Sequence, residues 1–424
     1  MNANLSYFPK LRRHSLPNRD WANAPGNANV FRPNIYDPAQ PDDQTALAEL
    51  LDSGPLWQVH DTLPAQLEEL AKSRHPRHKK MVDSSALVRN EIDEIVADCA
   101  LEQFGRWIHY PWSGRLIRVL PPAEFRELRL DRNRNKLTHG EQQTLGKLRV
   151  GVVGLSVGNA IARAIALEGT CGALKLADHD HLELSNLNRI QAGLEHLDLP
   201  KPVIAARQIL ELDPYLDVSV VPEGLNDDNI EAFFDAPGLD LLIEECDDLR
   251  VKVALREHAR RRQIPVFMET SDRGMLDVER FDQEPSRALL HGLLGPIGAS
   301  DIPKPLTNDD KVKFALPFFG PSTLSPRMAA SMLEIEESIS SWPQLGGDVL
   351  LGGATVAAAV RAFGLNQPLQ SGRRWVDLNR LISEPPAAGA TLGESVDEST
   401  HLSDTQVARL VGAGTAAPSG GNSQ

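Results

Sequence analysis

Between residues 148 and 268, short apolar stretches alternate with helical patterns, and this alternation limits the fold more than anything else in the sequence. The apolar stretches have the length of buried strands and cover residues 148–153, 173–177, 218–221, 239–243 and 264–268. The helical patterns cover residues 157–168, 202–211, 226–234 and 249–262. Such alternation is typical of βαβ units, in which helices cover a parallel sheet. The sequence therefore predicts an α/β fold with a Rossmann-like, doubly wound sheet.

A smaller unit precedes this sheet. Residues 1–42 are rich in Asn, Pro and Asp, which predicts a flexible arm or an extended strap. Residues 43–125 predict a small N-terminal α+β domain. Its expected elements are helices at 44–51, 63–71 and 84–105 and a hairpin at 106–110 and 115–120.

The sheet domain itself is expected to cover residues 126–382. Its later part shows helical patterns at 326–340 and 347–363 and a possible last strand within 374–382. Residues 383–424 have the composition of a linker, with one helical pattern at 404–413.

Composition excludes several classes of protein. The chain has 44 Lys and Arg against 58 Asp and Glu, a net charge of −14, which argues against nucleic acid as a partner. No signal-peptide pattern is present and the longest apolar run, 349–360, is too short for a bilayer, so no membrane role is expected. Cys99, Cys171 and Cys246 form no C-x-x-C pair, which predicts neither disulfides nor zinc and favours a cytoplasmic protein.

The first turn of the alternating region is rich in glycine. It reads Gly154-Leu-Ser156-Val-Gly158-Asn159 and lies where a strand is followed by a helix, whose N-terminal amides favour a phosphate. Ser156 and Asn159 stand where the dinucleotide fingerprint has its second and third glycines. A nucleotide site or a structural turn both remain open from this motif alone.

Further polar residues follow the second strand. Asp178 lies where a carboxylate can take ribose hydroxyls, although a turn residue would look the same. Asn186 and Arg189 are three residues apart, so one helical turn places them on one side, and both side chains suit phosphate oxygens. Lys201 stands at the entrance of the next helix.

Four carboxylates in five residues follow the fourth strand, in Glu244-Glu-Cys-Asp-Asp248. They repel one another unless a cation or basic side chains share the space, and Mg²⁺ is the obvious cation. Helix capping by Asp247 or Asp248 is an alternative compatible with metal binding.

Taken in order, these motifs resemble the ThiF and MoeB type adenylyltransferases, a family related to the ubiquitin-activating enzymes. The resemblance covers residues 129 to 282 and includes Arg129-Leu-Asp-Arg132, the Gly-rich turn, Asp178-x-Asp180, Ser185-Asn-Leu-Asn-Arg189, Lys201 and Asp248. It implies ATP- and Mg²⁺-dependent adenylation of a carboxylate on a peptide, a carrier protein or a small acid.

The resemblance also implies roles for single residues. Gly154, Ser156, Gly158 and Asp180 would belong to the nucleotide site, and Asp178 would hold the ribose. The phosphates would be bound by Asn186, Arg189 and Lys201. Asp248 would bind Mg²⁺, and Arg132 would reach the γ-phosphate from the partner subunit of a homodimer. Asp272 and Arg273, after the fifth strand, are candidate substrate contacts, with an internal salt bridge as the alternative.

Two departures from the family refine the expected chemistry. Zinc-binding C-x-x-C pairs are missing, and no cysteine stands where a thioester or persulfide step would need one, which favours activation without sulfur transfer.

Residues 244–249 and 269–282 resemble an actinobacterial subgroup, often labelled molybdopterin biosynthesis proteins, in which a nitroreductase-like domain comes next. Residues 417–424 resemble the opening of that domain, so we expect an N-terminal fragment or a naturally shortened version of a two-enzyme fusion, with an unrelated flexible tail as the alternative. FMN would be a cofactor only if that domain is present.

Two rival functions remain. Gly154 and Asp178 alone would serve an NAD(P)-binding oxidoreductase, although hydride transfer does not require Asn186, Arg189 and Lys201. The incomplete glycine turn also suits a catalytically idle module that holds a peptide for a flavin enzyme.

Overall fold

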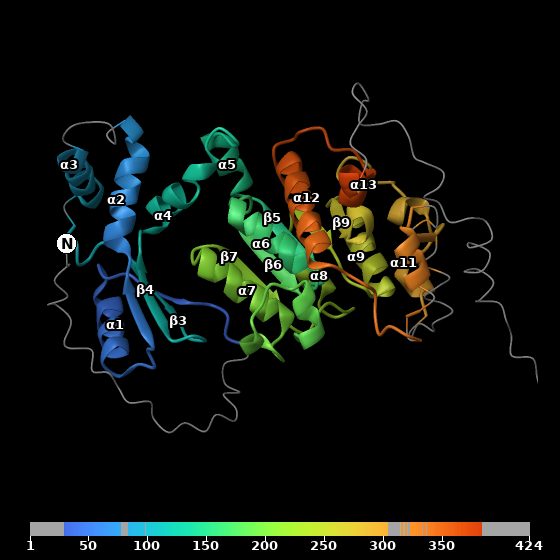
Figure 1. Cartoon of the computed structure of the whole chain (residues 1–424), viewed down its shortest axis with the longest axis horizontal. Coiled ribbons are helices and arrows are strands. Elements are labelled where there is room, and N and C mark those ends of the chain that lie inside the picture. The colour runs from blue at the N-terminus through green and yellow to red at the C-terminus, as the bar shows by residue number, and fades with distance from the viewer. Residues whose placement is uncertain are drawn as a thin grey trace, which may run out of the picture.

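The computed structural model contains two sheets, which lie in the left half and the centre of Figure 1. It describes residues 29–77, 84–97, 99–303, 314, 317–318, 320, 323–332, 334–335 and 337–383. Most of the predicted arm, most of the predicted linker and the helical pattern at 404–413 lie outside these residues.

The N-terminal sheet has four strands in the order β1-β3-β4-β2. The hairpin β3 (Arg106–Tyr110) and β4 (Arg115–Val119) forms its centre, between the short edge strands β1 (Asn34–Tyr36) and β2 (Gln58–Asp61). Its helices are α1 (Pro41–Ser53), α2 (Leu63–Arg74) and α3 (Ser84–Val96). Buried Leu63, Leu67 and Leu70 of α2 pack with Leu120 and form a small hydrophobic core within this N-terminal part.

Several polar contacts join this sheet to the larger domain. The Tyr110 hydroxyl donates to Leu210 O at 3.1 Å, and the Tyr215 hydroxyl donates to Leu120 O at 2.7 Å. Ahead of β1 the chain runs as an extended strap, where Arg32 donates to Val218 O at 2.7 Å. Two short helices, α4 (Pro122–Arg129) and α5 (His139–Leu145), connect the two parts of the chain.

The second sheet has seven strands in the order β11-β10-β9-β8-β5-β6-β7. Its first five strands along the chain are parallel and match the alternating pattern of the sequence. They are β5 (Arg149–Val153), β6 (Ala173–Ala177), β7 (Asp217–Val221), β8 (Leu241–Glu244) and β9 (Val266–Thr270). The predicted Rossmann-like α/β fold is confirmed.

Helices cover both faces of this sheet. One face carries α6 (Gly158–Glu168), α7 (Lys201–Leu212) and α12 (Gly346–Gly364), whose apolar residues share one core with Val150, Leu174 and Phe267. The other carries α8 (Ile230–Asp235) and α9 (Leu249–Arg261), which form a second core with Leu242 and Met268. Among the described helices only α12 has the length and apolar composition of a membrane span. Its buried side chains include Val349 and Val356, which pack into the first core.

The last part of the domain differs from the prediction. β10 (Met275–Glu279) and β11 (Gly372–Trp375) extend the sheet as antiparallel strands, and neither was predicted with these bounds. The expected strand at 374–382 is wrong beyond residue 375, because α13 (Leu378–Ser383) comes next. The helix expected from residue 326 is the short α11 (Pro326–Ser331).

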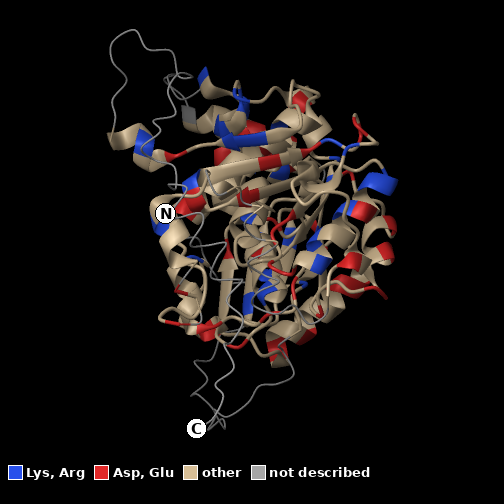
Figure 2. Cartoon of the chain, turned by 90° about the vertical axis from the view of Figure 1, so that its right-hand side faces the viewer, with Lys and Arg blue, Asp and Glu red and all other residues tan. Residues whose placement is uncertain are grey.

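Basic and acidic residues are interspersed over the described elements, as Figure 2 shows. The ion pairs reflect this mixture, since they occur in both sheets and in the helices around them, as in Arg74–Glu127 and Arg262–Asp235. A functional site is therefore indicated by local geometry rather than by a single charged face.

Candidate functional site

The strand order reverses at β5, which has β6 on one side and β8 on the other. The chain moves outward through β6 and β7, then crosses back to β8 and β9. In open α/β sheets, ligands bind beyond the carboxyl ends of the strands at such a point. The turn after β5 and the loop after β8 meet there, and the sequence predicts functional residues in both.

Gly154 brings these two segments into contact. Its φ of +86° is in the region that favours glycine, and a Cβ atom there would lie 2.5 Å from the carbonyl carbon and oxygen of Glu245. Gly158 begins α6, and its Cβ would lie 2.8 Å from Cγ1 of Val152. Gly154 therefore lets the turn lie against the segment that follows β8, and Gly158 lets α6 begin against β5.

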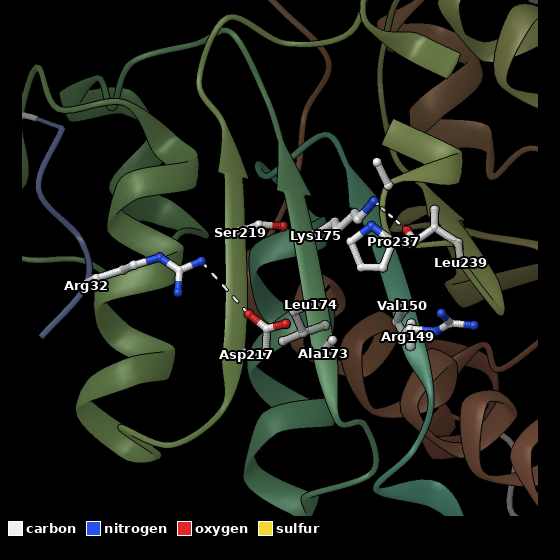
Figure 3. A pocket seen from close by; sticks show the side chains of 11 residues that line it. Arg32, Arg149, Val150, Ala173, Leu174, Lys175, Asp217, Ser219, Pro237 and Leu239 are labelled. Atoms are coloured by element: carbon white, nitrogen blue, oxygen red, sulfur yellow. Dashed lines mark hydrogen bonds and ion pairs between the residues drawn. The ribbon is translucent and has the colours of Figure 1, made fainter. Parts of the chain in front are cut away.

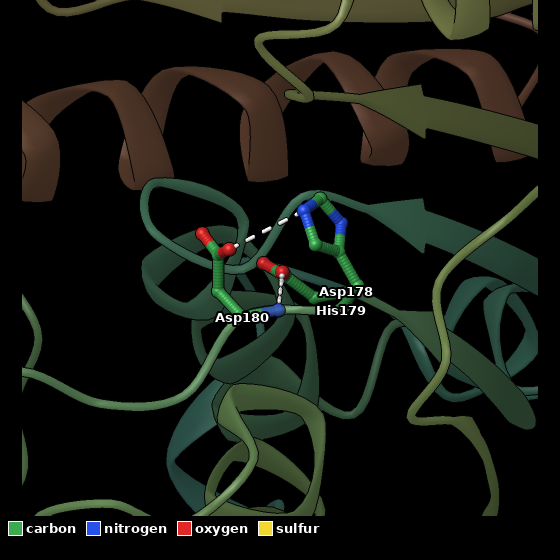
Figure 4. A group of neighbouring side chains, drawn as sticks. All are labelled: Asp178, His179 and Asp180. Carbon is green, nitrogen blue, oxygen red and sulfur yellow. Dashed lines mark hydrogen bonds and ion pairs between the residues drawn. The ribbon is translucent and has the colours of Figure 1, made fainter.

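Asp178 ties the end of β6 to the same turn. Its Oδ2 accepts the Leu155 amide at 2.6 Å and its Oδ1 accepts the Asp180 amide at 2.8 Å. The residue is 8% exposed. Figure 4 shows Asp178 with His179 and Asp180, whose ligand atoms lie within 4.8 Å of one another. Each carboxylate oxygen of Asp178 thus accepts one backbone N–H.

Lys201 pairs with Asp180 at the entrance of α7. The ammonium is 2.7 Å from Oδ2 of Asp180, and the Lys201 amide donates to Asp180 O at 2.9 Å. Burial of Asp180 works against its charge, but Lys201 outweighs it and lowers the pKa of the carboxyl. The Lys201 side chain is buried, whereas Asp180 is exposed, so the ammonium is held at the edge of the site.

Asn186 and Arg189 come from a 3-10 helix at Leu184–Asn188 and the residue after it. Asn186 is buried, and its Oδ1 accepts the Glu183 amide at 3.1 Å. Arg189 Nε donates to Ser156 Oγ at 3.0 Å, which brings the guanidinium to the Gly-rich turn. Burial lowers the pKa of Arg189, and no carboxylate among the described residues forms an ion pair with it.

The two aspartates after β8 have different surroundings. Asp248 is the N-cap of α9, where its Oδ1 accepts the Val251 amide at 3.1 Å. Asp247 reaches solvent although protein surrounds it on most sides, and this burial raises its pKa. Among charged neighbours, Lys252 and Glu244 act most strongly on Asp247, and Lys201 and Asp180 act on it more weakly. Asp247 in turn acts on Arg189. The sequence singled out Asp248, but its neighbour is the carboxylate coupled to the predicted phosphate-binding residues.

The other two carboxylates of this loop face the interior. Glu244 is fully buried, where Lys252 Nζ lies 2.8 Å and Arg256 Nη1 2.5 Å from its Oε2. Glu245 accepts the Glu269 amide at 2.8 Å, and burial together with the Glu269 carboxyl raises its pKa. Lys252 and Arg256 thus neutralise Glu244, the first of the four carboxylates in this segment.

The two arginines of the upstream motif lie in different settings. Arg129 donates to Ala166 O at 3.1 Å, at the end of α6, and pairs with Asp213 at 2.8 Å, so it holds structure. Arg132 is exposed and forms no hydrogen bond or ion pair with another described residue.

The structure gives both candidate substrate contacts internal partners. Asp272 accepts the Ser325 amide at 2.8 Å. Arg273 pairs with Asp377 at 2.9 Å and donates to Thr323 O at 3.1 Å. Both side chains thus bind later segments of the chain to the end of β9. The Arg273–Asp377 pair corresponds to the alternative of an internal salt bridge.

Two cysteines of the sheet domain are shielded, Cys246 beside the site and Cys171 at the opposite end of the strands, just ahead of β6. Cys171 is fully buried, which raises the pKa of its thiol to about 12. Burial also raises the pKa of Cys246, whose Sγ donates to Glu244 Oε1 at 2.9 Å. A raised pKa disfavours the thiolate, which is the form that acts as a nucleophile.

A cavity of about 180 Å³ lies elsewhere, between β5, β6, β7 and the end of α8 (Figure 3). The Lys175 ammonium at its wall donates to Phe233 O at 2.8 Å and Pro237 O at 2.7 Å. Arg32 lies 3.9 Å from Asp217 on the opposite side. Lys175 therefore holds the end of α8, and none of the predicted site residues lines this cavity.

Comparison with known proteins agrees with this geometry. Residues 130–286 match the model of the ThiF family. The match includes β5 to β10 and the predicted site residues from Arg132 to Arg273.

Curated relatives with this similarity include a protein of Mycobacterium tuberculosis described as uncharacterized, 50% identical over 331 residues, which cover 76% of this chain and 46% of that protein. The tRNA threonylcarbamoyladenosine dehydratase of Escherichia coli is 32% identical over 143 residues, which cover 33% of this chain and 53% of that enzyme. The chain thus spans about half the length of these relatives.

Solved structures show weaker overall similarity. The Escherichia coli tRNA threonylcarbamoyladenosine dehydratase, also solved with AMP, superposes with a TM-score of 0.41 at 20% identity, over 57% of this chain and 95% of that one. Escherichia coli MccB, solved with AMPCPP and MccA, gives a TM-score of 0.39 at 16% identity, over 56% of this chain and 63% of that one.

Proposed function

We propose that this protein is an ATP- and Mg²⁺-dependent adenylyltransferase that activates a carboxylate as an acyl-adenylate. The observation that carries the proposal is that Arg189, Lys201 and Asp247 converge where the turn after β5 meets the loop after β8. The ThiF family match over the same residues supports it.

The basic residues suit a polyphosphate. Arg189 offers a planar set of N–H donors with no carboxylate partner among the described residues, and Lys201 adds an ammonium held by Asp180. Asn186 lies in the 3-10 helix directly before Arg189, and the first turn of α6 adds backbone amides to the site. These groups would bind and orient the triphosphate.

The loop after β8 suits Mg²⁺. Hard cations prefer carboxylate oxygens and keep several waters, which fits a partly solvated side chain such as Asp247. Burial raises its pKa, and none of the described residues forms an ion pair with it, so a bound cation would supply one. We assign the metal role to Asp247, because Asp248 uses one oxygen to cap α9. Bound Mg²⁺ would neutralise charge on the phosphates.

The reaction itself needs positioning more than a protein nucleophile. An oxygen of the acceptor carboxylate attacks the α-phosphorus of ATP, a new P–O bond forms, and the bond to the bridging oxygen breaks, so that pyrophosphate leaves. Lys201 and Arg189 would stabilise the charge on the departing pyrophosphate. No proton has to be removed from an acceptor that is already ionised.

The shielded cysteines bear on the fate of the acyl-adenylate. Cys171 is buried, Cys246 is half-buried, and the pKa values of both thiols are raised. The acyl-adenylate would therefore react with a nucleophile supplied by the acceptor or by a second molecule. We infer an acceptor that is a peptide, a carrier protein or a small acid. Exposed Arg132 would reach the phosphates from the partner subunit of a homodimer in the cytoplasm.

Calorimetry with Mg²⁺·ATP tests this proposal most directly. We expect saturable ATP binding that weakens when Mg²⁺ is chelated, and pyrophosphate exchange once a correct acceptor is added. If NADH or NADPH bound and ATP did not, the oxidoreductase alternative would replace the proposal. ATP binding without exchange across peptide, carrier and small-acid acceptors would favour the idle binding module.

A further inference from the structure

The surroundings of Arg189 leave most of its donors free. A guanidinium has five N–H groups. Nε donates to Ser156 Oγ and Nη1 donates to Asn188 Oδ1, each at 3.0 Å. No other described residue accepts from Arg189. Both acceptors are neutral, so these bonds fix the plane of the guanidinium without cancelling its charge.

Asn188 uses both ends of its amide. While Oδ1 accepts from Arg189, Nδ2 donates to the main-chain oxygen of Gln344 at 2.7 Å. Gln344 lies just ahead of α12 and is 156 residues further along the chain than Asn188. One amide side chain therefore joins the arginine to the segment that leads into α12.

The first residue of α12 is close to the same point. A Cβ atom on Gly346 would lie 2.6 Å from the main-chain oxygen of Asn188, which is closer than atoms can approach without a shift. The next residue, Gly347, has no atom within 4 Å of such a Cβ. The start of α12 thus rests on the backbone of Asn188 through one glycine and not through its neighbour.

We propose that Asn188 is a positioning residue for Arg189, and that the first turn of α12 holds Asn188 in place. This inference rests on the proposed function, because it takes Arg189 as a phosphate ligand. Three segments then determine the direction of one guanidinium: the Gly-rich turn through Ser156, the 3-10 helix through Asn188, and α12 through Gln344 and Gly346.

The effect of Asn188 should be specific to the phosphates. Without its bond, the guanidinium keeps one fixed contact and samples more orientations, so part of its interaction with a triphosphate is lost. Losing one charge-assisted hydrogen bond corresponds to about a tenfold change in affinity. Adenosine, which lacks phosphates, should bind as before.

The experiment compares variants of the full chain by calorimetry with Mg²⁺·ATP and with adenosine. We expect Asn188→Ala to weaken ATP binding about tenfold and to leave adenosine unchanged. Gly346→Ala should weaken ATP binding in the same direction, and Gly347→Ala, the matched glycine, should equal the wild type. In an Arg189→Lys background, Asn188→Ala should add little further loss, because it acts through the arginine.

Different outcomes separate this inference from the proposed function. If the wild type bound no ATP, the proposed function would fail and the inference with it. If the wild type bound ATP but Asn188→Ala matched it, or lost ATP and adenosine equally, only the positioning role would be overturned. Full additivity with Arg189→Lys would also overturn it. Equal effects of Gly346→Ala and Gly347→Ala would remove α12 from the proposal.

Discussion

Two groups of charged residues lie near the end of β8, and they differ in how completely their charges are paired within the protein. In the interior, Glu244 binds Lys252 and Arg256, and Arg256 also pairs with Glu279 at 2.5 Å. We call these four residues the interior network. At the carboxyl ends of the strands, Asp247 is exposed, Arg189 is half-buried and the Lys201 side chain is buried. We call these three residues the strand-end group; among the described residues, its one direct ion pair joins Lys201 to Asp180. The interior network is complete by itself, whereas the strand-end group has charge left for a ligand.

The pKa values express the same difference. Burial alone would favour the protonated form of Glu244, yet Lys252 and Arg256 outweigh it and lower its pKa to about 2. Burial raises the pKa of Asp247, because Lys252 and Lys201 compensate only in part. An acidic residue is thus a weak indication of function until its partners are known, and the same loop provides both cases.

The largest expected effect comes from breaking the interior network. Arg256→Met leaves Glu244 and Glu279 without their shared cation, and removing one partner of a buried pair costs about 3–5 kcal/mol. Urea unfolding should show this loss. Arg261→Met, an exposed arginine on the same helix, is the control and should change stability by less than about 0.5 kcal/mol. Equal stability of the two variants would contradict the comparison.

Glu269 is a buried carboxyl outside the network. No basic side chain pairs with it among the described residues, and burial raises its pKa to about 8. Between an unfolded pKa near 4.5 and about pH 8, the folded protein therefore holds a proton that the unfolded chain has released. Proton linkage then makes folding stability fall as pH rises through this window, by at most about 1.4 kcal/mol per pH unit.

Glu269→Gln removes this titration. The stability of the variant relative to the wild type should therefore increase from pH 5 to pH 8 and level off above. Thermal unfolding at several pH values measures it. The interior network provides the contrast, because Glu244 has a lowered pKa and its contribution is lost only as pH falls from about 4.5 towards 2. A constant difference between variant and wild type across pH 5–8 would show that Glu269 is ionised in the folded state.

The next effect concerns the strand-end group. Lys201→Met removes an ammonium from the proposed phosphate site, and a hydrogen bond to a charged group is worth about 1.5–3 kcal/mol, or about 10- to 100-fold in affinity for ATP. Exposed Lys147→Met is the control for a loss of one positive charge. If both variants weakened ATP binding equally, a general electrostatic effect would explain the result better than a site at Lys201.

The sequence predicted the parallel part of the sheet well and its antiparallel part poorly. The strands β5, β8 and β9 are largely apolar runs, the pattern of buried parallel strands. β10 was not predicted because Asp277 and Glu279 interrupt its apolar pattern, although both are buried. Arg373 and His291 pair with Asp277, and Arg256 pairs with Glu279. The partners come from distant segments, which no local pattern can reveal. The edge strands β1 and β2 are three and four residues long and too short to leave a period.

For the site, spacing located the segments but not the roles of single side chains. Asn186, Arg189 and Lys201 follow β6, and the structure links Arg189 to the Gly-rich turn through Ser156. The contact of Asn188 with Gln344 joins residues far apart in the chain and could not be read from either segment. At the loop after β8, the rule that aspartate caps helices already offered a second use for Asp248. Because α9 begins at Leu249, this rule assigns the cap to Asp248 and leaves Asp247 as the carboxylate without a capping role.

The smallest expected effect separates these two neighbouring aspartates. Asp247→Asn removes a carboxylate that is coupled to Lys201, and we expect about tenfold weaker Mg²⁺·ATP binding, the lower end of what a charged contact is worth. Asp248→Asn keeps a good capping residue, since asparagine caps helices about as well as aspartate, so both ATP affinity and stability should stay near the wild type. Titrating Mg²⁺ at fixed ATP in both variants measures the difference. Because both variants lose one negative charge from the same loop, a shared long-range effect cancels in the comparison. A larger loss in Asp248→Asn would assign the metal to the capping residue, as the family resemblance implies, and would show that a capping carboxylate can serve both uses.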